Sequence, residues 1–116
     1  MDIEKKQRLV DAGIDFADAL NRFMGNENML ERFLGKFVQD KNYPALVEAL
    51  EKGDREAALT ASHTLKGITG NLSMISLFEL LTEQVKLFRE DDFDGAKALM
   101  GKITEEYNAI ISAING

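Results

Sequence analysis

The chain has no cysteine and no tryptophan, and it has only one proline and one histidine among 116 residues. Without cysteine there is no disulfide bond, no thiol nucleophile and no thiolate-bound metal, and a cytoplasmic location is the simplest expectation. A zinc site would have to combine the single histidine, His63, with carboxylates alone, which is an unusual ligand set. Because Pro44 is the only proline, little interrupts long helices.

Strong positive charge and long apolar runs are also missing. Twenty acidic residues against 14 basic ones give a net charge of −6, whereas a surface that binds a phosphate backbone needs clustered positive charge. No apolar run approaches the roughly 20 residues that cross a bilayer, and the start of the chain is too polar for a secretory signal. We therefore expect no nucleic-acid partner and no membrane association.

The residues that are present indicate one helical domain. Because 45% of the residues are apolar, residues 1–116 are expected to form a single domain around one core, and nothing in the pattern indicates more than a monomer. Apolar residues recur every three or four positions and no segment alternates, so the sequence predicts an all-α fold. One such stripe carries Met29, Leu30, Phe33, Leu34, Phe37 and Val38.

Four long helices are expected, at about residues 27–52, 54–71, 74–90 and 93–114. Short connections between them favour an up-down antiparallel four-helix bundle. The only proline follows residues 42 and 43, where it should kink or break the first of these helices. Asp54 and Ser73 are in position to cap the second and third.

The residues before Gly25 are expected to form a short helical cover over one end of the bundle. Asp15 can cap a helix that runs to about Met24, and Gly25 can stop it. The first dozen residues show only a weak apolar pattern, so we expect them to fray.

His63 lies within the second long helix, and its direction follows from helical geometry. With about 100° of turn per residue, five apolar side chains cluster within about 40° of the side opposite to His63. They are Ala58, Ala61, Leu65, Ile68 and Leu72. This stripe should face the core, so the imidazole should point to solvent.

The neighbours of His63 on the outward face indicate more than an idle surface histidine. They are Glu56, Leu59, Thr60, Lys66, Gly67 and Gly70. Each glycine inside a helix costs about 1 kcal/mol relative to alanine, and the absence of a Cβ would let another molecule approach the imidazole closely. The alternative is a helix that ends early at Gly67 or Gly70. The apolar residues keep their helical spacing past Gly67, which favours a continuous helix. Lys66, one turn from His63, could attract an anion held on the imidazole.

These residues resemble a known family. The run HTLKG at residues 63–67 is similar to the H-x-L-K-G signature of histidine phosphotransfer domains. The segment LNRFMGN at residues 20–26 resembles the family's early L-x-R-x-x-G-N segment, and residues 33–37 resemble the helix that follows it. The spacing from Gly53-Asp54 to His63 also fits, and the resemblance covers residues 12–114.

The resemblance implies a phosphorelay carrier. Such a domain takes a phosphoryl group on histidine, generally on Nε2, from the aspartyl phosphate of a response-regulator receiver domain, or passes it to one. It implies His63 as acceptor and donor, Lys66 and Gly67 in support of the phosphoryl group, and no cofactor or metal in this chain, since the receiver brings the magnesium. The expected partners are a receiver domain, a hybrid sensor histidine kinase, or both.

The expected docking face surrounds His63. It includes Leu59, Thr60 and Gly70, and Phe23, Met24 and Met29 are candidates for the adjoining surface. The sequence departs from the family at two places. Ser73 stands where the family commonly has glycine, and Gln84-Val85 stands where it often has Leu-Glu. The second departure puts in doubt any polar contact from the third long helix towards the phosphohistidine.

Other functions lack their motifs. There is no G-x-x-x-x-G-K-[ST] loop, which argues against an autonomous kinase or ATPase. The G-x-x-G at residues 67–70 follows no strand, as the KH RNA-binding module would require. Ser62 and Asp54 cannot form a triad with His63 from one helix. The remaining alternative is a helical adaptor that binds a receiver or a kinase without carrying phosphate.

Overall fold

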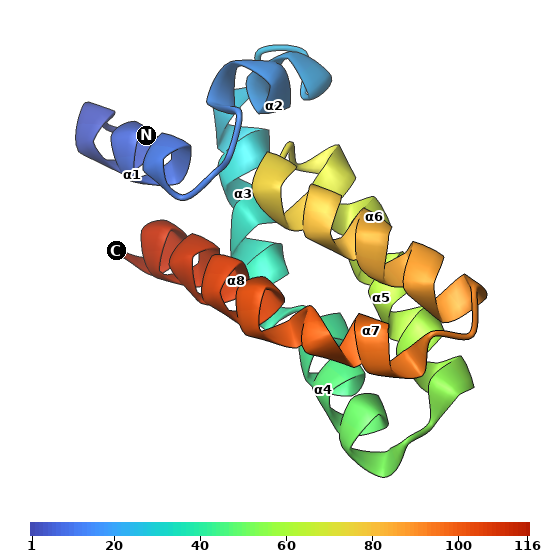
Figure 1. The fold of residues 1–116 in the computed structure, drawn as a ribbon. Helices are drawn as coiled ribbons and strands as arrows, with labels where there is room; N and C mark the ends of the chain where they lie inside the picture. Colours follow the sequence, from blue (N-terminus) through green and yellow to red (C-terminus); the bar gives the residue numbers. More distant parts are fainter.

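The computed structural model describes residues 1–116, and its regular secondary structure is entirely helical (Figure 1). The helices are α1 (Ile3–Asp11), α2 (Phe16–Arg22), α3 (Glu27–Gln39), α4 (Asn42–Lys52), α5 (Arg55–Asn71), α6 (Ile75–Arg89), α7 (Phe93–Ala98) and α8 (Met100–Asn115). The only strand-like feature is an isolated bridge between Ile14 and Met74. The prediction of an all-α fold is confirmed.

The expected helix at residues 27–52 is two helices, because the chain breaks between α3 and α4. Asp40 is extended, with φ −65° and ψ 139°, and its carboxylate accepts a hydrogen bond from the backbone N–H of Asn42 at 2.9 Å. Pro44 lies in the first turn of α4, where its missing N–H costs nothing. In a continuous helix its ring would clash with the carbonyl of Asp40, four residues earlier. The break therefore comes four residues before the proline.

The expected helix at residues 93–114 is also interrupted. Between α7 and α8 only Leu99 falls outside both helices, and its φ of −74° and ψ of −13° remain close to helical values. The two helices run nearly in line along one side of the molecule (Figure 1). The interruption is thus a local distortion, and a buried side chain described below explains it.

Helix caps follow the sequence at two of the three predicted places, Asp15 and Asp54, and Asn26 caps the start of α3 as well. The side chains of Asp15, Asn26 and Asp54 each accept a hydrogen bond from the backbone N–H three residues on. The prediction that Ser73 caps the next helix is wrong. Met74 is the N-cap of α6 and makes no side-chain cap, while Ser73 has a φ of +54° and uses its hydroxyl elsewhere.

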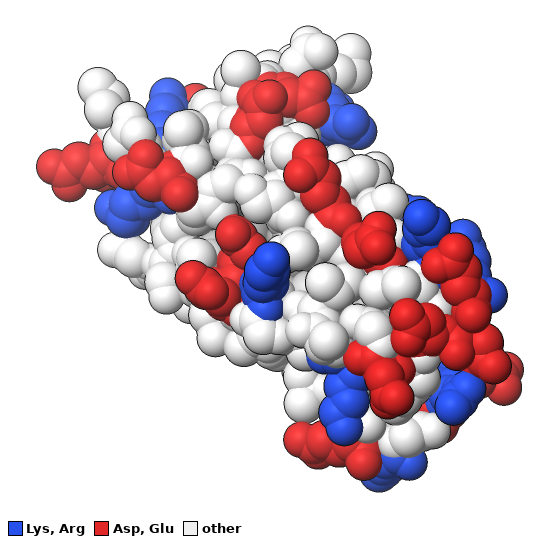
Figure 2. Space-filling model, in the orientation of Figure 1, with Lys and Arg blue, Asp and Glu red and all other residues white.

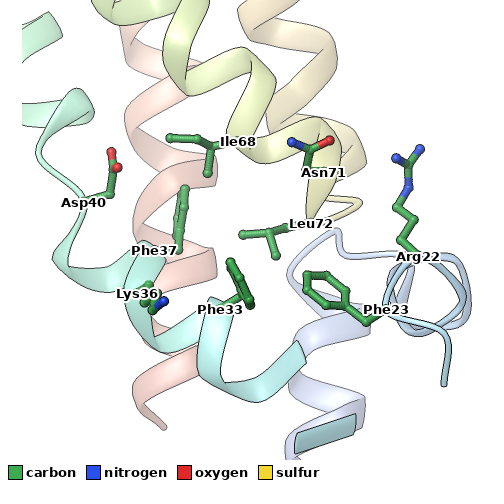
Figure 3. Close-up of a pocket in the computed structure, with 9 residues that line it drawn as sticks. All are labelled: Arg22, Phe23, Phe33, Lys36, Phe37, Asp40, Ile68, Asn71 and Leu72. Carbon is green, nitrogen blue, oxygen red and sulfur yellow. The ribbon is translucent and has the colours of Figure 1, made fainter. Parts of the chain in front are cut away.

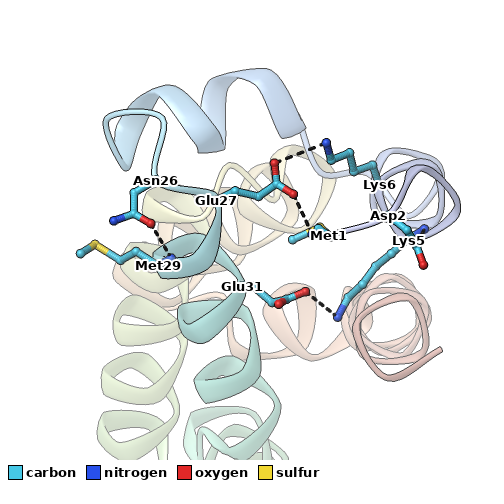
Figure 4. A network of polar contacts seen from close by, with 8 residues as sticks. All are labelled: Met1, Asp2, Lys5, Lys6, Asn26, Glu27, Met29 and Glu31. Atoms are coloured by element: carbon cyan, nitrogen blue, oxygen red, sulfur yellow. Dashed lines mark hydrogen bonds and ion pairs between the residues drawn. The ribbon is translucent and has the colours of Figure 1, made fainter.

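The N-terminal residues pack on the rest of the molecule, so the expectation of fraying is wrong. Leu9 of α1 is fully buried, and α1 lies against α8. Lys5 and Lys6 form ion pairs with Glu31 and Glu27 of α3, both at 3.3 Å, and Glu27 also lies 2.8 Å from the nitrogen of Met1 (Figure 4). These contacts order a segment whose own apolar pattern is weak.

Helices α4 and α6 both pack against α5. Helix α6 in turn contacts α7 and α8, and α8 contacts α1 and α3. The core between them is built from aliphatic side chains and Phe37. None of the helices combines the length and apolar character needed to cross a lipid bilayer. On the face drawn in Figure 2, acidic and basic side chains alternate without a continuous basic area.

Candidate functional site

His63 lies near the middle of α5 and is exposed, as the sequence predicts. Ala58, Ala61, Leu65 and Leu72 are buried on the opposite side of the helix. The nearby hydroxyls are engaged with other groups, since Thr64 donates to the carbonyl of Thr60 and Ser62 donates to Gln84. The imidazole therefore makes no hydrogen bond within the chain, and both its nitrogens are open to another molecule.

Gly67 lies one turn beyond His63 inside a continuous helix, so the alternative of an early helix end is wrong. It is exposed, and a Cβ built on it would meet no atom within 4 Å. No packing inside the chain requires a glycine here. The fold therefore gives no reason for the free-energy cost of a glycine at position 67. Space for a partner next to His63 would give one.

Gly70 differs from Gly67, and the expectation that it leaves open space is wrong. A Cβ at Gly70 would lie 2.9 Å from Cε1 of Phe78. The ring of Phe78, on α6, fills the space that a side chain would take. Gly70 thus lets α5 and α6 approach each other, which is a packing role within the chain.

Lys66, Leu59 and Thr60 remain around His63. Lys66 is partly buried and takes part in none of the ion pairs of the chain. Its ammonium group is therefore available to an incoming anion. Leu59 is partly buried and Thr60 is exposed, so both reach the surface beside the imidazole.

An open groove of about 600 Å³ lies farther along α5, between this helix, α2 and α3 (Figure 3). Its lining consists of Arg22, Phe23, Phe33, Lys36, Phe37, Asp40, Ile68, Asn71 and Leu72. Figure 3 shows Arg22 at one end and Asp40 at the other, with the aromatic rings between them. On α5, Asn71 points about 80° from His63, whereas Ile68 and Leu72 point about 140° and 180° away. The groove therefore opens on a neighbouring flank of the helix, one to two turns beyond the imidazole.

Aromatic rings form much of the apolar part of the groove lining, and two exposed methionines, Met24 and Met29, lie outside that lining. The rings of Phe23 and Phe33 lie 5.2 Å apart between centroids, and Phe33 is 40% exposed. Met24 is 94% exposed and Met29 is 39% exposed. The ammonium of Lys36 lies over the Phe33 ring, 4.8 Å from its centroid. The groove thus offers exposed aromatic carbon with a positive charge at its edge.

Phe33 and Lys36 are among the groove residues that the sequence did not single out as surface candidates. Phe33 belongs to the apolar stripe of α3, which predicts a core position. The signal that could have found it is its place at the edge of the stripe, since Leu30, Leu34 and Phe37 share a narrower buried face. Of the candidates for the adjoining surface, Phe23 lines the groove.

Gln84 and Val85, where the family pattern is broken, both point inward and are buried. Gln84 accepts a hydrogen bond from Ser62 Oγ at 2.8 Å and donates to the carbonyl of Ala96 at 3.0 Å. Helix α6 therefore offers no polar group from these positions to His63. The same contact removes Ser62 as a nucleophile, because its hydroxyl is buried and donates to an amide.

No three His, Cys, Asp or Glu side chains gather closely enough to hold a metal ion. Comparison with models of protein families, with curated proteins and with solved structures found no match to the chain.

Proposed function

We propose that this chain is a histidine phosphotransfer domain, a reversible phosphoryl carrier that acts on His63 in a two-component phosphorelay in the cytoplasm. In this proposal α3 with α4, α5, α6, and α7 with α8 are the four members of an up-down antiparallel bundle, and α1 and α2 cover one end. The observation that carries it is an exposed His63 that makes no hydrogen bond, within helix α5 and beside an open Gly67. The HTLKG sequence around it supports the same conclusion.

The chemistry is an exchange of one phosphoryl group. The lone pair of neutral His63 Nε2 attacks the phosphorus of an aspartyl phosphate on the partner. The bond from phosphorus to the aspartate oxygen breaks, and the carboxylate leaves with the electron pair. The proton on Nδ1 stays in place, so no base within this chain is needed, which agrees with an imidazole that contacts no carboxylate. The reverse reaction returns the phosphoryl group to aspartate.

Charge and space around His63 suit the product. A phosphoryl group adds negative charge at the imidazole, and the unpaired ammonium of Lys66 lies one turn away to balance it. Phosphoryl transfer is promoted mainly by positioning and by charge. The Mg²⁺ that the reaction requires would be held by the partner receiver. This chain alone is thus expected to have no kinase activity.

The groove beside His63 is the expected docking area for the receiver, together with Leu59 and Thr60. Its aromatic floor supplies apolar contact, and Lys36 supplies a positive charge at its edge. A partner seated there would extend over Gly67 to the imidazole. The helical adaptor, which would use the same surface without carrying phosphate, is the competing possibility.

A transfer assay separates the two. Wild type and His63→Gln are mixed with phosphorylated receiver domains and Mg²⁺, and acid-labile phosphate on this chain is followed over time. We expect label on wild type within the time of mixing, selective for one receiver, and none on His63→Gln, which should keep its fold because the side chain is exposed. Binding of a receiver without label on wild type would favour the adaptor.

A further inference from the structure

Gln84 is a fully buried polar side chain at the meeting point of α5, α6, α7 and α8. Its Oε1 accepts from Ser62 of α5, and its Nε2 donates to the carbonyl of Ala96 in α7 and to Sδ of Met100 in α8, at 3.0 and 3.2 Å. The orientation of the amide is fixed by chemistry, because the Ala96 carbonyl can only accept and so must face the NH₂ group. Both polar atoms of the amide thus bond to residues of other helices.

This amide explains why the last long helix is interrupted. In a continuous helix the Ala96 carbonyl would accept from the N–H of Met100, four residues on. Here it accepts from Gln84 Nε2, and the N–H of Leu99 reaches it in a three-residue turn at 3.3 Å. A side chain that enters the backbone ladder in this way is a known cause of a helix distortion. Gln84 therefore connects the α7–α8 junction to α5.

The connection to α5 is made at the residue directly before His63. Up to His63, the buried residues of α5 are Ala58, Ala61 and Ser62, and the first large one is Leu65. Small side chains interlock little with neighbouring helices, so they do not fix the rotation of α5 about its own axis. The buried Ser62–Gln84 hydrogen bond fixes this rotation, because only one rotation of α5 about its axis directs Ser62 at Gln84.

We propose that Gln84 is a positioning residue for His63, acting through Ser62. Adjacent helical residues point about 100° apart, so the Ser62–Gln84 hydrogen bond fixes the direction of the imidazole relative to Leu59, Lys66 and the docking surface. This role rests on the proposed function, since it matters only if His63 must meet a partner in one geometry.

The decisive variant is Ser62→Ala with Gln84→Met, which removes both partners of the hydrogen bond and nearly preserves volume. Neither Ser62 nor Gln84 is left unpaired, and the Ala96 carbonyl keeps the N–H of Leu99 as a donor. The chain should therefore still fold, as a cooperative melt would show. In ¹H–¹⁵N spectra, we expect broadened or doubled amide signals at residues 57–66 and unchanged signals in α1 and α3. The rate of phosphoryl transfer to His63 should fall about tenfold, in line with the effect of small misplacements.

Val85→Ala is the matched control. Val85 is buried on the same helix next to Gln84 and has no part in the hydrogen bond. Its truncation should therefore lower the melting temperature. The signals at residues 57–66 should stay sharp, and the transfer rate should stay within twofold of wild type. If the double variant does not fold, Ser62→Ala alone removes the link and Ser62→Thr restores the hydroxyl. Ser62→Ala should then show the same signal changes, and Ser62→Thr should reverse them.

Sharp single signals at residues 57–66 in the variants that lack the link would overturn the proposal, as would an unchanged transfer rate despite altered signals. The spectra need no phosphate. A wild-type chain that accepts no phosphoryl group would therefore contradict the proposed function, while the spectra would still decide whether Gln84 fixes α5.

Discussion

The hydroxyl of Ser73 donates a hydrogen bond of 2.6 Å to the carboxylate of Asp18. This contact joins the loop after α5 to α2, and two backbone bonds strengthen it, from Asp15 N–H to the Ser73 carbonyl and from Ile75 N–H to the Gly13 carbonyl. The same carboxylate forms an ion pair with Arg22 at 3.0 Å, and Arg22 lines the groove. The end of the His63 helix and one wall of the groove are thus held together.

Acid should weaken this junction. The hydrogen bond from Ser73, and then Arg22, lower the pKa of Asp18 below its ordinary value of 3.8. A carboxyl group whose pKa is lower in the folded state stabilises the fold above its unfolded pKa. That contribution is lost progressively as the pH falls from 3.8 through the lower folded value. Asp18→Asn should therefore show a smaller loss of stability between neutral pH and pH 3 than wild type, measured by urea unfolding.

Glu83→Gln is a suitable control for Asp18→Asn, because Glu83 is exposed and forms no ion pair. The two variants lose the same charge. Equal acid dependence in wild type and Asp18→Asn would show that the junction does not depend on the Asp18 charge.

The backbone of Ser73 gives a second prediction about the junction. Ser73 is buried and has a φ of +54°. Both Ser73→Ala and Ser73→Gly remove the hydroxyl, but only alanine keeps the steric cost of the left-handed conformation, about 1 kcal/mol. Ser73→Ala should therefore be less stable than Ser73→Gly by about that amount in chemical denaturation. The reverse order would mean that the conformation of residue 73 relaxes when the hydrogen bond is lost.

Gly67 and Gly35 form a matched pair for testing whether the surface next to His63 must stay open. Both are exposed inside helices, and a Cβ at either would meet no atom within 4 Å. Replacing either with alanine should stabilise the fold by about 0.5–1 kcal/mol. Gly67→Ala should slow phosphoryl transfer and Gly67→Leu should slow it further, whereas Gly35→Ala should not. Normal transfer by Gly67→Leu would remove the role of Gly67 in partner approach.

The aromatic edge of the groove should matter for docking more than for folding. Phe33→Ala removes a 40% exposed ring that packs on Phe23, and we expect the dissociation constant for the cognate receiver to rise about tenfold. Ile3→Ala truncates a side chain that is 83% exposed on α1, away from the groove, and should leave binding unchanged. Titration calorimetry would compare the two. Equal affinities for Phe33→Ala and wild type would place the docking surface elsewhere.

The helical periodicity was sufficient to predict the direction of His63, because Leu65 and Leu72 repeat in phase with Ala58 and Ala61 and all four are buried. It could not separate Gly67 from Gly70. The two point in directions only about 60° apart on α5, and their difference depends on Phe78, a residue of another helix. The local sequence pattern thus predicts the direction in which a residue points from its helix. It does not predict which side chain of another helix packs against that residue.

Gln84 and Ser73 show the same limit. A glutamine in the apolar stripe of α6 gives no sign of partners on α5 and α7, because these lie 22 and 12 residues away in sequence. Serine is a favourable N-cap residue, but the backbone of Ser73 has a φ of +54° and its hydroxyl donates a hydrogen bond to Asp18, 55 residues away. Tertiary contacts override the local preference in both cases.

The carrier role of His63 can be tested directly because His63 is the only histidine of the chain. Labelling histidine with ¹⁵N therefore marks one imidazole, and its two nitrogen signals can be followed as a phosphorylated receiver and Mg²⁺ are added. If His63 carries the phosphoryl group, the Nε2 signal will move and couple to phosphorus, and unphosphorylated receiver added later will reverse the change. Imidazole signals that never couple to phosphorus, while amide signals along the groove shift on receiver binding, would contradict a carrier role for His63.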